Sequence, residues 1–154
     1  MLKEETGGGI GNDAPQIDTE RNLTMYRALT AAMAKSLVRS AHDCSDGGLA
    51  VAVAECCFGC DGATTIDLDV LVKDNLDAWG VLFGESLGRI LVSVKPDDAE
   101  AFETAMTGNS IARIGTVGDK KTLQFTMGGK TILKANLATL LGAWKGTLNM
   151  GGGV

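Results

Sequence analysis

Apolar residues recur at helical spacing in the first part of the chain, directly after Asp18. They stand three or four positions apart, as residues on one side of an α-helix do. Asp18, with Glu20 and Arg21 just beyond it, is typical of a helix start. The pattern predicts a helix from Asp18 onward. The positions that carry the pattern are Leu23, Tyr26, Leu29, Thr30, Met33 and Leu37.

The pattern then switches between strand-like and helix-like segments. A strand is predicted over 37–43, where β-branched and apolar residues lead into a glycine turn. The small apolar residues over 46–58 predict a helix directly after it. Polar and apolar residues alternate over 64–70, which is typical of a strand with one covered face. A short helix over 75–83 and a strand over 89–94 complete the first half.

The second half predicts one helix, three strands and a last helix. Pro96 and the acidic residues after it are typical of a helix start, so a helix is expected over 96–107, ending before Gly108. Strands are expected over 110–117 and 122–127. Gly128-Gly129 predicts a hairpin turn into a strand over 130–133. The last helix carries Leu137, Leu140, Leu141 and Trp144.

Strands interleaved with helices, with one hairpin among them, predict an α+β fold, a mixed β-sheet packed with helices. Residues 17–147 are expected to form this one domain. The Gly-rich, polar segment 1–16, which contains Pro15, is interpreted as a flexible linker remnant. Residues 148–154 are expected to be a disordered tail.

Composition excludes some classes of partner. The chain has 154 residues and a net charge of −5, with no basic cluster, so nucleic acid is not an expected partner. The longest uncharged apolar run, Leu49–Ala54, is far shorter than the ~20 residues that span a bilayer. Acidic residues follow Met1 quickly and no signal peptide is visible. A cytoplasmic location is therefore expected.

Four cysteines lie close together, and the last two have the Cys-x-x-Cys spacing of redox and zinc sites. A structural zinc site adds a second such pair or histidines at set spacing, but His42 is the chain's one histidine. Cys56 and Cys57 fall in the alanine- and valine-rich helix, where cysteine behaves as a small buried apolar residue. Packing is the favoured interpretation, with metal or redox chemistry as the alternative. The four are Cys44, Cys56, Cys57 and Cys60.

The segment His42–Leu49 carries most of the candidate chemistry, because it joins a strand to a helix through a tight turn. The first N–H groups of a helix are unpaired and favour an anion. Gly47 and Gly48 let the backbone approach a bound group closely, and Asp43 offers carboxylate oxygens suited to Mg²⁺. These features point to a magnesium-bound phosphate. The alternative is that Ser45 or Asp46 simply caps the helix.

Other polar residues have two interpretations each. His42 is either a general base or, as favoured here, a strand-end histidine that bonds the following loop. Glu55 is either a solvated charge or the partner of a basic group. Glu85, Ser86 and Arg89 could face a substrate phosphate, but local capping and pairing is favoured.

The two tryptophans, Trp79 and Trp144, lie on different predicted helices. Their size and amphipathic rings are typical of core or interface anchors.

Three segments carry a resemblance to a known family. Residues 42–55, HDCSDGGLAVAVAE, resemble the HD-x-SDGGLAVA-x-AE signature of phosphoribosylformylglycinamidine synthase. Residues 83–89, FGESLGR, are similar to a second family segment, FGES-x-GR, and the end of the chain from Ile111 to Trp144 resembles the end of the synthetase subunit. The resemblance covers roughly residues 18–146. It implies a C-terminal domain of the kind found in aminoimidazole ribonucleotide synthase and its relatives.

The resemblance also implies the chemistry of the turn. The family uses ATP and Mg²⁺ to activate formylglycinamide ribonucleotide, which ammonia from glutamine then converts to the amidine. By analogy Asp43 would bind Mg²⁺. The nucleotide phosphates of ATP or ADP would contact His42, Ser45, Asp46, Gly47 and Gly48. No catalytic residue is assigned, and this nucleotide site is often structural in the family.

The family further implies partners. They are the preceding domains of the same synthetase subunit, a separate glutaminase subunit and a small accessory subunit. A fragment without those domains is expected to be inactive alone. The alternatives are a domain of a related ATP-dependent enzyme, such as thiamine monophosphate kinase or aminoimidazole ribonucleotide synthase, or a non-catalytic scaffold domain.

Overall fold

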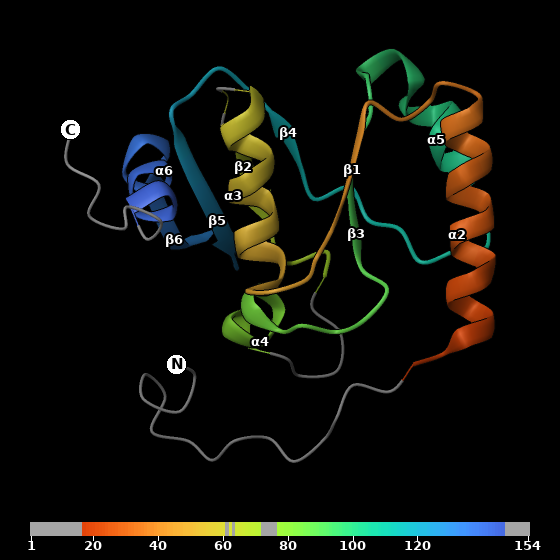
Figure 1. Cartoon of the computed structure of the whole chain (residues 1–154), viewed down its shortest axis with the longest axis horizontal. Coiled ribbons are helices and arrows are strands. Elements are labelled where there is room, and N and C mark those ends of the chain that lie inside the picture. Colours follow the sequence, from red (N-terminus) through yellow and green to blue (C-terminus); the bar gives the residue numbers. More distant parts are fainter. Residues whose placement is uncertain (1–16, 61, 63, 72–76, 147–154) are drawn as a thin grey trace, which may run out of the picture.

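The computed structural model describes residues 17–60, 62, 64–71 and 77–146. The expected linker remnant 1–16 and tail 148–154 lie outside the described residues. Two sheets and several helices alternate along the chain (Figure 1). The helical elements are α2 (Thr19–Ala34), α3 (Gly48–Cys60), α4 (Ala78–Phe83), the short 3₁₀ helix η1 (Pro96–Asp98), α5 (Ala99–Ala105) and α6 (Leu137–Gly146). The strands are β1 (Ser40–Asp43), β2 (Thr64–Asp67), β3 (Ile90–Ser93), β4 (Gly115–Val117), β5 (Thr122–Met127) and β6 (Lys130–Asn136).

The larger sheet has four strands in the order β4-β2-β5-β6. Strand β2 runs parallel to β5, whereas the β2–β4 and β5–β6 pairs are antiparallel. The β5–β6 hairpin turns through Gly128 and Gly129, both at positive φ, as the sequence predicts. The mixed sheet packed with helices confirms the predicted α+β fold class.

The smaller sheet is an antiparallel ribbon of β1 and β3 that pairs Ser40 with Ser93 and Asp43 with Ile90. A strand was expected from Leu37, but β1 begins at Ser40. The reason lies just upstream, because Ser36 has a φ of 60° and turns the chain sharply after α2. Leu37 and Val38 then pack on the cluster between α2 and α5 instead of pairing as a strand.

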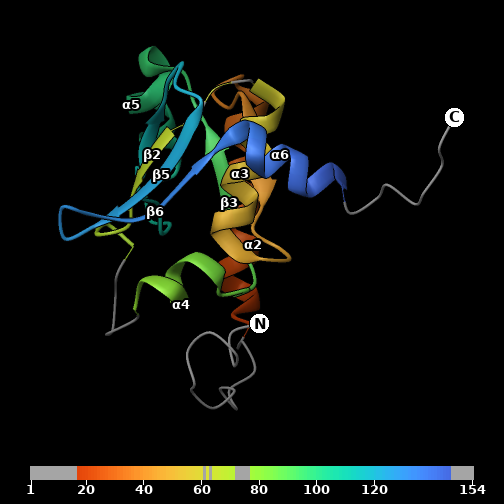
Figure 2. The ribbon, with the colours of Figure 1, turned by 90° about the vertical axis from the view of Figure 1, so that its left-hand side faces the viewer.

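Helix α3 lies at the centre of the molecule, beside the β1–β3 ribbon, with α6 next to it (Figures 1 and 2). The two helices cover one face of the four-stranded sheet, and their apolar residues meet Ile66, Leu123 and Phe125 from the sheet. The residues between these strand positions, such as Thr65 on β2, are not buried. The predicted alternation is therefore observed, although the strand expected over 64–70 ends at Asp67. It places the main core directly under α3.

Helix α2 is formed as predicted, and the carboxylate of Asp18 accepts a hydrogen bond from the backbone N–H of Arg21 at 3.0 Å. Its buried side differs from the sequence pattern. Leu29 and Ala32 pack against α5, with Phe102 and Met106 opposite. Helix α2 buries a narrow face, and four residues of the predicted stripe are exposed. These are Leu23, Tyr26, Thr30 and Met33.

Several element ends also differ from the sequence patterns. Helix α3 begins at Gly48 instead of residue 46, because the chain still turns at positions 46 and 47. The predicted helix 96–107 divides into η1 and α5, with Gly108 at positive φ beyond it. Of the predicted strand 110–117 only Gly115–Val117 pairs, whereas β6 extends to Asn136. Within the described residues, no helix is long and apolar enough to cross a membrane.

Candidate functional site

The turn between β1 and α3 is shaped by backbone hydrogen bonds at both ends. The N–H of Cys44 donates to the carbonyl of Arg89 at 3.0 Å, which continues the ribbon one residue beyond β1. The N–H of Gly48 donates to the carbonyl of Ser45 at 2.9 Å and closes the turn. Gly47 and Gly48 both have positive φ, 77° and 65°. The predicted order of strand, glycine turn and helix is therefore present.

The space that the glycines leave is filled by the chain itself. A Cβ on Gly48 would lie 2.8 Å from the carbonyl oxygen of Leu82 and 2.7 Å from that of Gly84. A Cβ on Gly47 would lie 2.3 Å from a methyl carbon of Val51. Gly48 was expected to let the backbone approach a bound group, but the group it approaches is the carboxyl end of α4. Both glycines are required by the fold whether or not a ligand binds.

Glu85 ties the loop after α4 to the turn. Its carboxylate accepts a hydrogen bond from the N–H of Gly47 at 2.9 Å, across 38 positions of sequence. A carboxylate at this amide fits the preference of a helix amino terminus for negative charge. The turn is thus stabilised by an acidic group of the chain itself. Ser86, the next residue, is exposed.

Arg89 faces the backbone of its own segment. Its guanidinium donates to the carbonyl of Val81 at 3.2 Å and to the carbonyl of Gly84. Its Nε is buried and has no hydrogen-bond partner within the described part of the chain. These contacts fit the local-pairing interpretation of Arg89, because they direct its guanidinium group toward the end of α4.

Three polar side chains remain open on the outer side of the turn. The side chain of Asp43 is 76% exposed, and Ser45 and Asp46 are also exposed. Among the hydrogen bonds of the described residues, none is made by the side chain of Ser45 or Asp46. The simple capping alternative is therefore not observed for either residue, and their oxygens face solvent beside the amino terminus of α3.

His42 lies beneath these residues and contacts two acceptors. Its Nδ1 is 2.7 Å from the backbone oxygen of Asp43, and its Nε2 is 3.1 Å from a carboxylate oxygen of Glu55 on α3. The first contact stays within β1, because Asp43 is its last residue, so the expected bond to the following loop is not the one observed. The second makes Glu55 the partner of a basic group.

Three of the four cysteines are packed as predicted, and the side chain of Cys60 lies outside the described part of the chain. Cys44 and Cys57 are buried in the main core, and Cys56 is half-buried. Burial raises the pKa of the Cys44 thiol above its ordinary value, with the Asp43 charge adding to this and Arg89 opposing it. The thiol therefore stays protonated at neutral pH. No group of three potential metal-binding His, Cys, Asp or Glu side chains occurs within the described residues.

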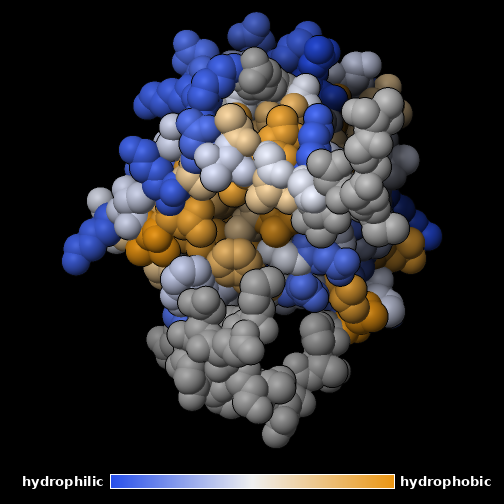
Figure 3. All heavy atoms as spheres, turned by 60° about the vertical axis from the view of Figure 1, so that its left-hand side comes forward, coloured by the Kyte–Doolittle hydropathy of each residue, from blue (hydrophilic) through white to orange (hydrophobic). Residues whose placement is uncertain are grey.

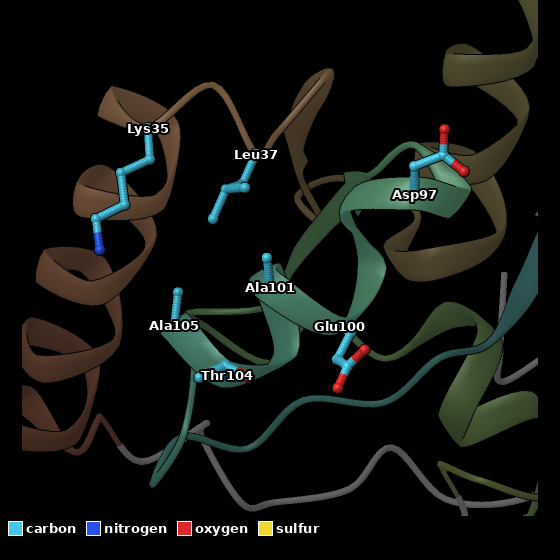
Figure 4. A pocket seen from close by; sticks show the side chains of 7 residues that line it. All are labelled: Lys35, Leu37, Asp97, Glu100, Ala101, Thr104 and Ala105. Atoms are coloured by element: carbon cyan, nitrogen blue, oxygen red, sulfur yellow. The ribbon is translucent and has the colours of Figure 1, made fainter.

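Two hollows lie away from the turn. One, of about 550 Å³, lies between α2 and α5 (Figure 4). Figure 4 shows Leu37, Ala101 and Ala105 converging between the helices, whereas the carboxylates of Asp97 and Glu100 point away. Lys35 and Thr104 also line this hollow. A ligand pocket needs several polar groups that converge on its occupant, and the two carboxylates do not.

The other hollow, of about 250 Å³, is an apolar groove along α3 and α6. Glu55 is the one charged residue that lines it, and its apolar lining includes Phe58, Phe83, Leu140 and Trp144. Figure 3 shows apolar surface gathered on this side of the molecule. The rings of Trp144 and Phe58 lie 5.8 Å apart, yet Trp144 is 51% exposed.

Comparison with known proteins identifies the family. Residues 1–128 match the family described as AIR synthase related protein, C-terminal domain. The chain belongs to this family. It is 38% identical over 138 residues to the phosphoribosylformylglycinamidine synthase subunit PurL of Salinibacter ruber, which covers 88% of this chain and 18% of that protein. The AIR synthase related chain therefore spans about a fifth of the length of this relative.

Solved structures share the fold. Phosphoribosylformylglycinamidine synthase II of Thermotoga maritima superposes with a TM-score of 0.75 at 18% identity, over 86% of this chain and 24% of that one. T. maritima PurL complexed with ATP gives a TM-score of 0.69 at 18% identity, over 75% and 21%. The PurLQS structure from T. maritima gives 0.70 at 16% identity, over 88% and 23%. The predicted likeness to the C-terminal domain of AIR synthase relatives is confirmed.

Two contacts of the site were not predicted from the sequence. The Glu85–Gly47 hydrogen bond joins residues whose chemistry was noted separately, and so does the His42–Glu55 contact. Neither the charge of Glu85 nor its position before a strand predicts that it accepts a hydrogen bond from Gly47. Pairing β1 with β3 brings the two loops together, and only the three-dimensional arrangement shows this.

Proposed function

We propose that this chain is the C-terminal domain of a phosphoribosylformylglycinamidine synthase subunit. That enzyme converts formylglycinamide ribonucleotide, ATP and glutamine-derived ammonia to the amidine in purine biosynthesis. We also propose that the protein is located in the cytoplasm. The family membership, the 38% identity to PurL and the fold shared with an ATP-bound PurL support it. The identity to PurL favours this enzyme over the related kinase and synthase.

Within that enzyme, the β1–α3 turn contributes half of a site for a magnesium-bound nucleotide phosphate. The observation that carries this is the exposure of Asp43, Ser45 and Asp46 together at the amino terminus of α3. Backbone amides there favour an anion. A bare phosphate would be repelled by the carboxylates, so a cation between them is needed.

The donor set fits Mg²⁺ arriving with its nucleotide. Mg²⁺ is usually held by one or two carboxylates together with phosphate oxygens and water. Asp43 offers one such carboxylate, and the described residues contain no group of three that could hold a metal alone. The ion would supply charge neutralisation between Asp43 and the phosphates. The chain's own residues orient the phosphate: Ser45 offers a hydroxyl, and the amino terminus of α3 offers the positive end of the helix dipole. The N–H groups of Gly47 and Gly48 already donate to Glu85 and to the carbonyl of Ser45.

A scaffold domain is the second candidate, because several features of the turn have a purely structural purpose. Gly48 packs on α4, and Glu85 already accepts from Gly47. A scaffold requires these contacts but gives no reason for three polar side chains to remain open beside them. The nucleotide function accounts for both.

Calorimetric titration of the chain with ADP and Mg²⁺ tests the nucleotide half-site. We expect binding that requires Mg²⁺ and that weakens at least about tenfold in Asp43→Ala, because a carboxylate ligand of the ion is lost. The exposed Asp119 lies far along the sequence on another loop, so Asp119→Ala is the matched control and should bind as the native chain does.

The outcomes separate the candidates. Binding that survives Asp43→Ala would place the nucleotide elsewhere. No binding to the native chain would mean either a scaffold or a site completed only by the neighbouring domains. The same titration of the complete synthase subunit, with and without Asp43→Ala, then separates these two. The chain alone is not expected to form the amidine, since it spans about a fifth of the relative.

The apolar groove along α3 and α6 supports docking against the preceding domains of the same subunit. Trp144 and Trp79 are 51% and 45% exposed, and aromatic residues of this kind are typical of interface centres. Trp79 stacks on Phe83, which also lines the groove. The remaining four-fifths of a relative's length supplies the covering surface. Glutaminase and a small accessory subunit, as in an assembly like PurLQS, are the further partners of the proposal.

Hydrogen exchange tests this docking. We expect amides of α6 to exchange at least about tenfold more slowly in the complete synthase subunit than in this chain alone, because a covered helix opens less often. Amides of α5, which lies away from the groove, serve as the internal control and should change little. Equal exchange of α6 in both proteins would show that the groove is not a domain interface.

A further inference from the structure

An amide that a phosphate would meet at the β1–α3 turn already has an acidic partner. Oε1 of Glu85 accepts the hydrogen bond of the Gly47 N–H at 2.9 Å, and the carbonyl of Ser45 accepts that of the Gly48 N–H at 2.9 Å. Glu85 is exposed, so its carboxylate lies at the surface of the turn. A negative group of the chain itself therefore occupies a place that favours an anion.

The backbone that carries Glu85 is fixed by contacts of the residue before it. The carbonyl of Gly84 accepts a hydrogen bond from the guanidinium of Arg89. The same carbonyl oxygen packs against Gly48, where a Cβ would lie 2.7 Å from it. The carboxylate of Glu85 thus reaches the turn from a fixed backbone position, and its charge stays close to any phosphate that binds there.

The exposed charges at the turn are negative. Asp43 and Asp46 are both exposed on the turn that Glu85 contacts. The guanidinium of Arg89 donates to carbonyls at the end of α4, and the ring of His42 contacts a carboxylate on α3. A phosphate that arrives without a cation therefore meets like charges, which repel it.

We propose that Glu85 is a specificity-determining residue, whose carboxylate repels metal-free phosphate so that the half-site accepts a nucleotide only with its Mg²⁺. This inference rests on the proposed function, in which Asp43 binds the magnesium ion. An unfavourable charge lowers the affinity for the wrong ligand, and specificity is a difference between two affinities. The two carboxylates then differ in role, because Asp43 binds the ion and Glu85 rejects the ligand that lacks it.

The charge of Glu85 can be separated from its hydrogen bond. A purely structural role needs an acceptor for the Gly47 N–H but no charge. The amide oxygen of a glutamine is such an acceptor, so Glu85→Gln keeps the hydrogen bond and removes the charge. Glu85→Ala would remove both, and its effect could not be assigned to either.

The test measures the affinity of the chain for ADP with Mg²⁺ and for ADP in EDTA, by nuclear magnetic resonance titration of the backbone amides. In Glu85→Gln we expect the affinity for metal-free ADP to rise at least about fivefold, the effect of one unit charge at about 4 Å in water. The affinity for Mg²⁺–ADP is not expected to fall, because Asp43 still binds the ion. Thermal unfolding confirms that each variant is folded.

Glu103→Gln is the matched control, because it removes the same charge from an exposed glutamate on α5, away from the turn (Figure 1). It should change neither affinity. An equal rise for metal-free ADP in Glu103→Gln would show an effect of net charge alone and overturn the inference. A lower affinity for Mg²⁺–ADP in Glu85→Gln would also overturn it, because Glu85 would then be a ligand of the ion.

Failures of the two proposals are distinguishable. If Mg²⁺–ADP binding depends on Asp43 but Glu85→Gln leaves the ratio of the two ADP affinities unchanged, the specificity inference is wrong and the half-site stands. If the chain alone does not bind, the same affinities are measured by calorimetry on the complete synthase subunit and its variants. If binding there is absent or independent of Asp43, the proposed half-site fails, and the inference fails with it.

Discussion

Gly48→Ala is expected to destabilise the chain by about 3 kcal/mol, because the methyl group has no room and the backbone angle is unfavourable. A φ of 65° costs an L-residue about 1–2 kcal/mol. The new Cβ would also lie 2.7 and 2.8 Å from carbonyl oxygens of Gly84 and Leu82. These are backbone atoms, so the start of α3 or the end of α4 must move, which adds about 1–3 kcal/mol. Equilibrium unfolding in urea measures the loss.

Gly59→Ala is the matched control in the same helix. Gly59 is helical, has no positive φ, and would place its Cβ in open space. We expect this variant to gain about 0.5–1 kcal/mol, because alanine has the higher helix propensity. Equal stability of the Gly48→Ala chain and the native chain would mean that α3 and α4 are not packed as described. A loss of nucleotide affinity with native stability would instead make Gly48 a ligand contact.

The sequence predicted the elements well, because their signals are local. Periodicity, the Asp18 start signal and the Gly128-Gly129 turn each act within a few residues, and the helices and strands they predict are present. The outward side of α2 was not predictable in the same way. Its apolar residues occupy more than one face, and the face that is buried depends on α5, which lies some seventy positions later. Which apolar residues of α2 are buried therefore depends on its tertiary contacts and not on its local sequence.

The candidate site was predictable in its residues but not in its contacts. Asp43, Ser45, Gly47 and Gly48 follow one another in one short segment. Both the family resemblance and the candidate phosphate chemistry could therefore be predicted from that segment. The structure adds that Gly48 faces α4 and that Glu85 accepts from Gly47. Both contacts depend on the pairing of β1 with β3, which no local pattern specifies.

Together with the proposed half-site, these contacts would give the turn two roles. The inner side of the turn is fixed by glycines, by the end of α4 and by Glu85, whereas the outer side presents Asp43 and Ser45. Ligand-binding groups are most effective when the elements beneath them are rigid. Substitutions on the inner side should therefore first alter stability, and substitutions on the outer side should first alter binding.

Arg89→Ala is expected to destabilise the chain by about 2–3 kcal/mol, because it leaves the end of α4 without its donor. The guanidinium donates to the carbonyls of Val81 and Gly84, and hydrogen bonds from a charged group are worth about 1.5–3 kcal/mol. Part of this loss is offset, because Arg89→Ala also removes the buried Nε, which has no hydrogen-bond partner within the described residues. Equilibrium unfolding again measures the loss, together with Mg²⁺–ADP affinity at a temperature where both chains are folded.

Arg89→Lys and Arg113→Ala complete the comparison. A lysine has no planar fork and cannot reproduce both hydrogen bonds, so Arg89→Lys should recover only part of the stability. Arg113 is exposed, and its removal should change stability by less than about 0.5 kcal/mol. If Arg89 bound a substrate phosphate instead, Arg89→Lys would keep native stability and lose nucleotide affinity. The structure predicts the opposite order, because Arg89 stabilises α4, and α4 supports the turn through Gly84 and Glu85.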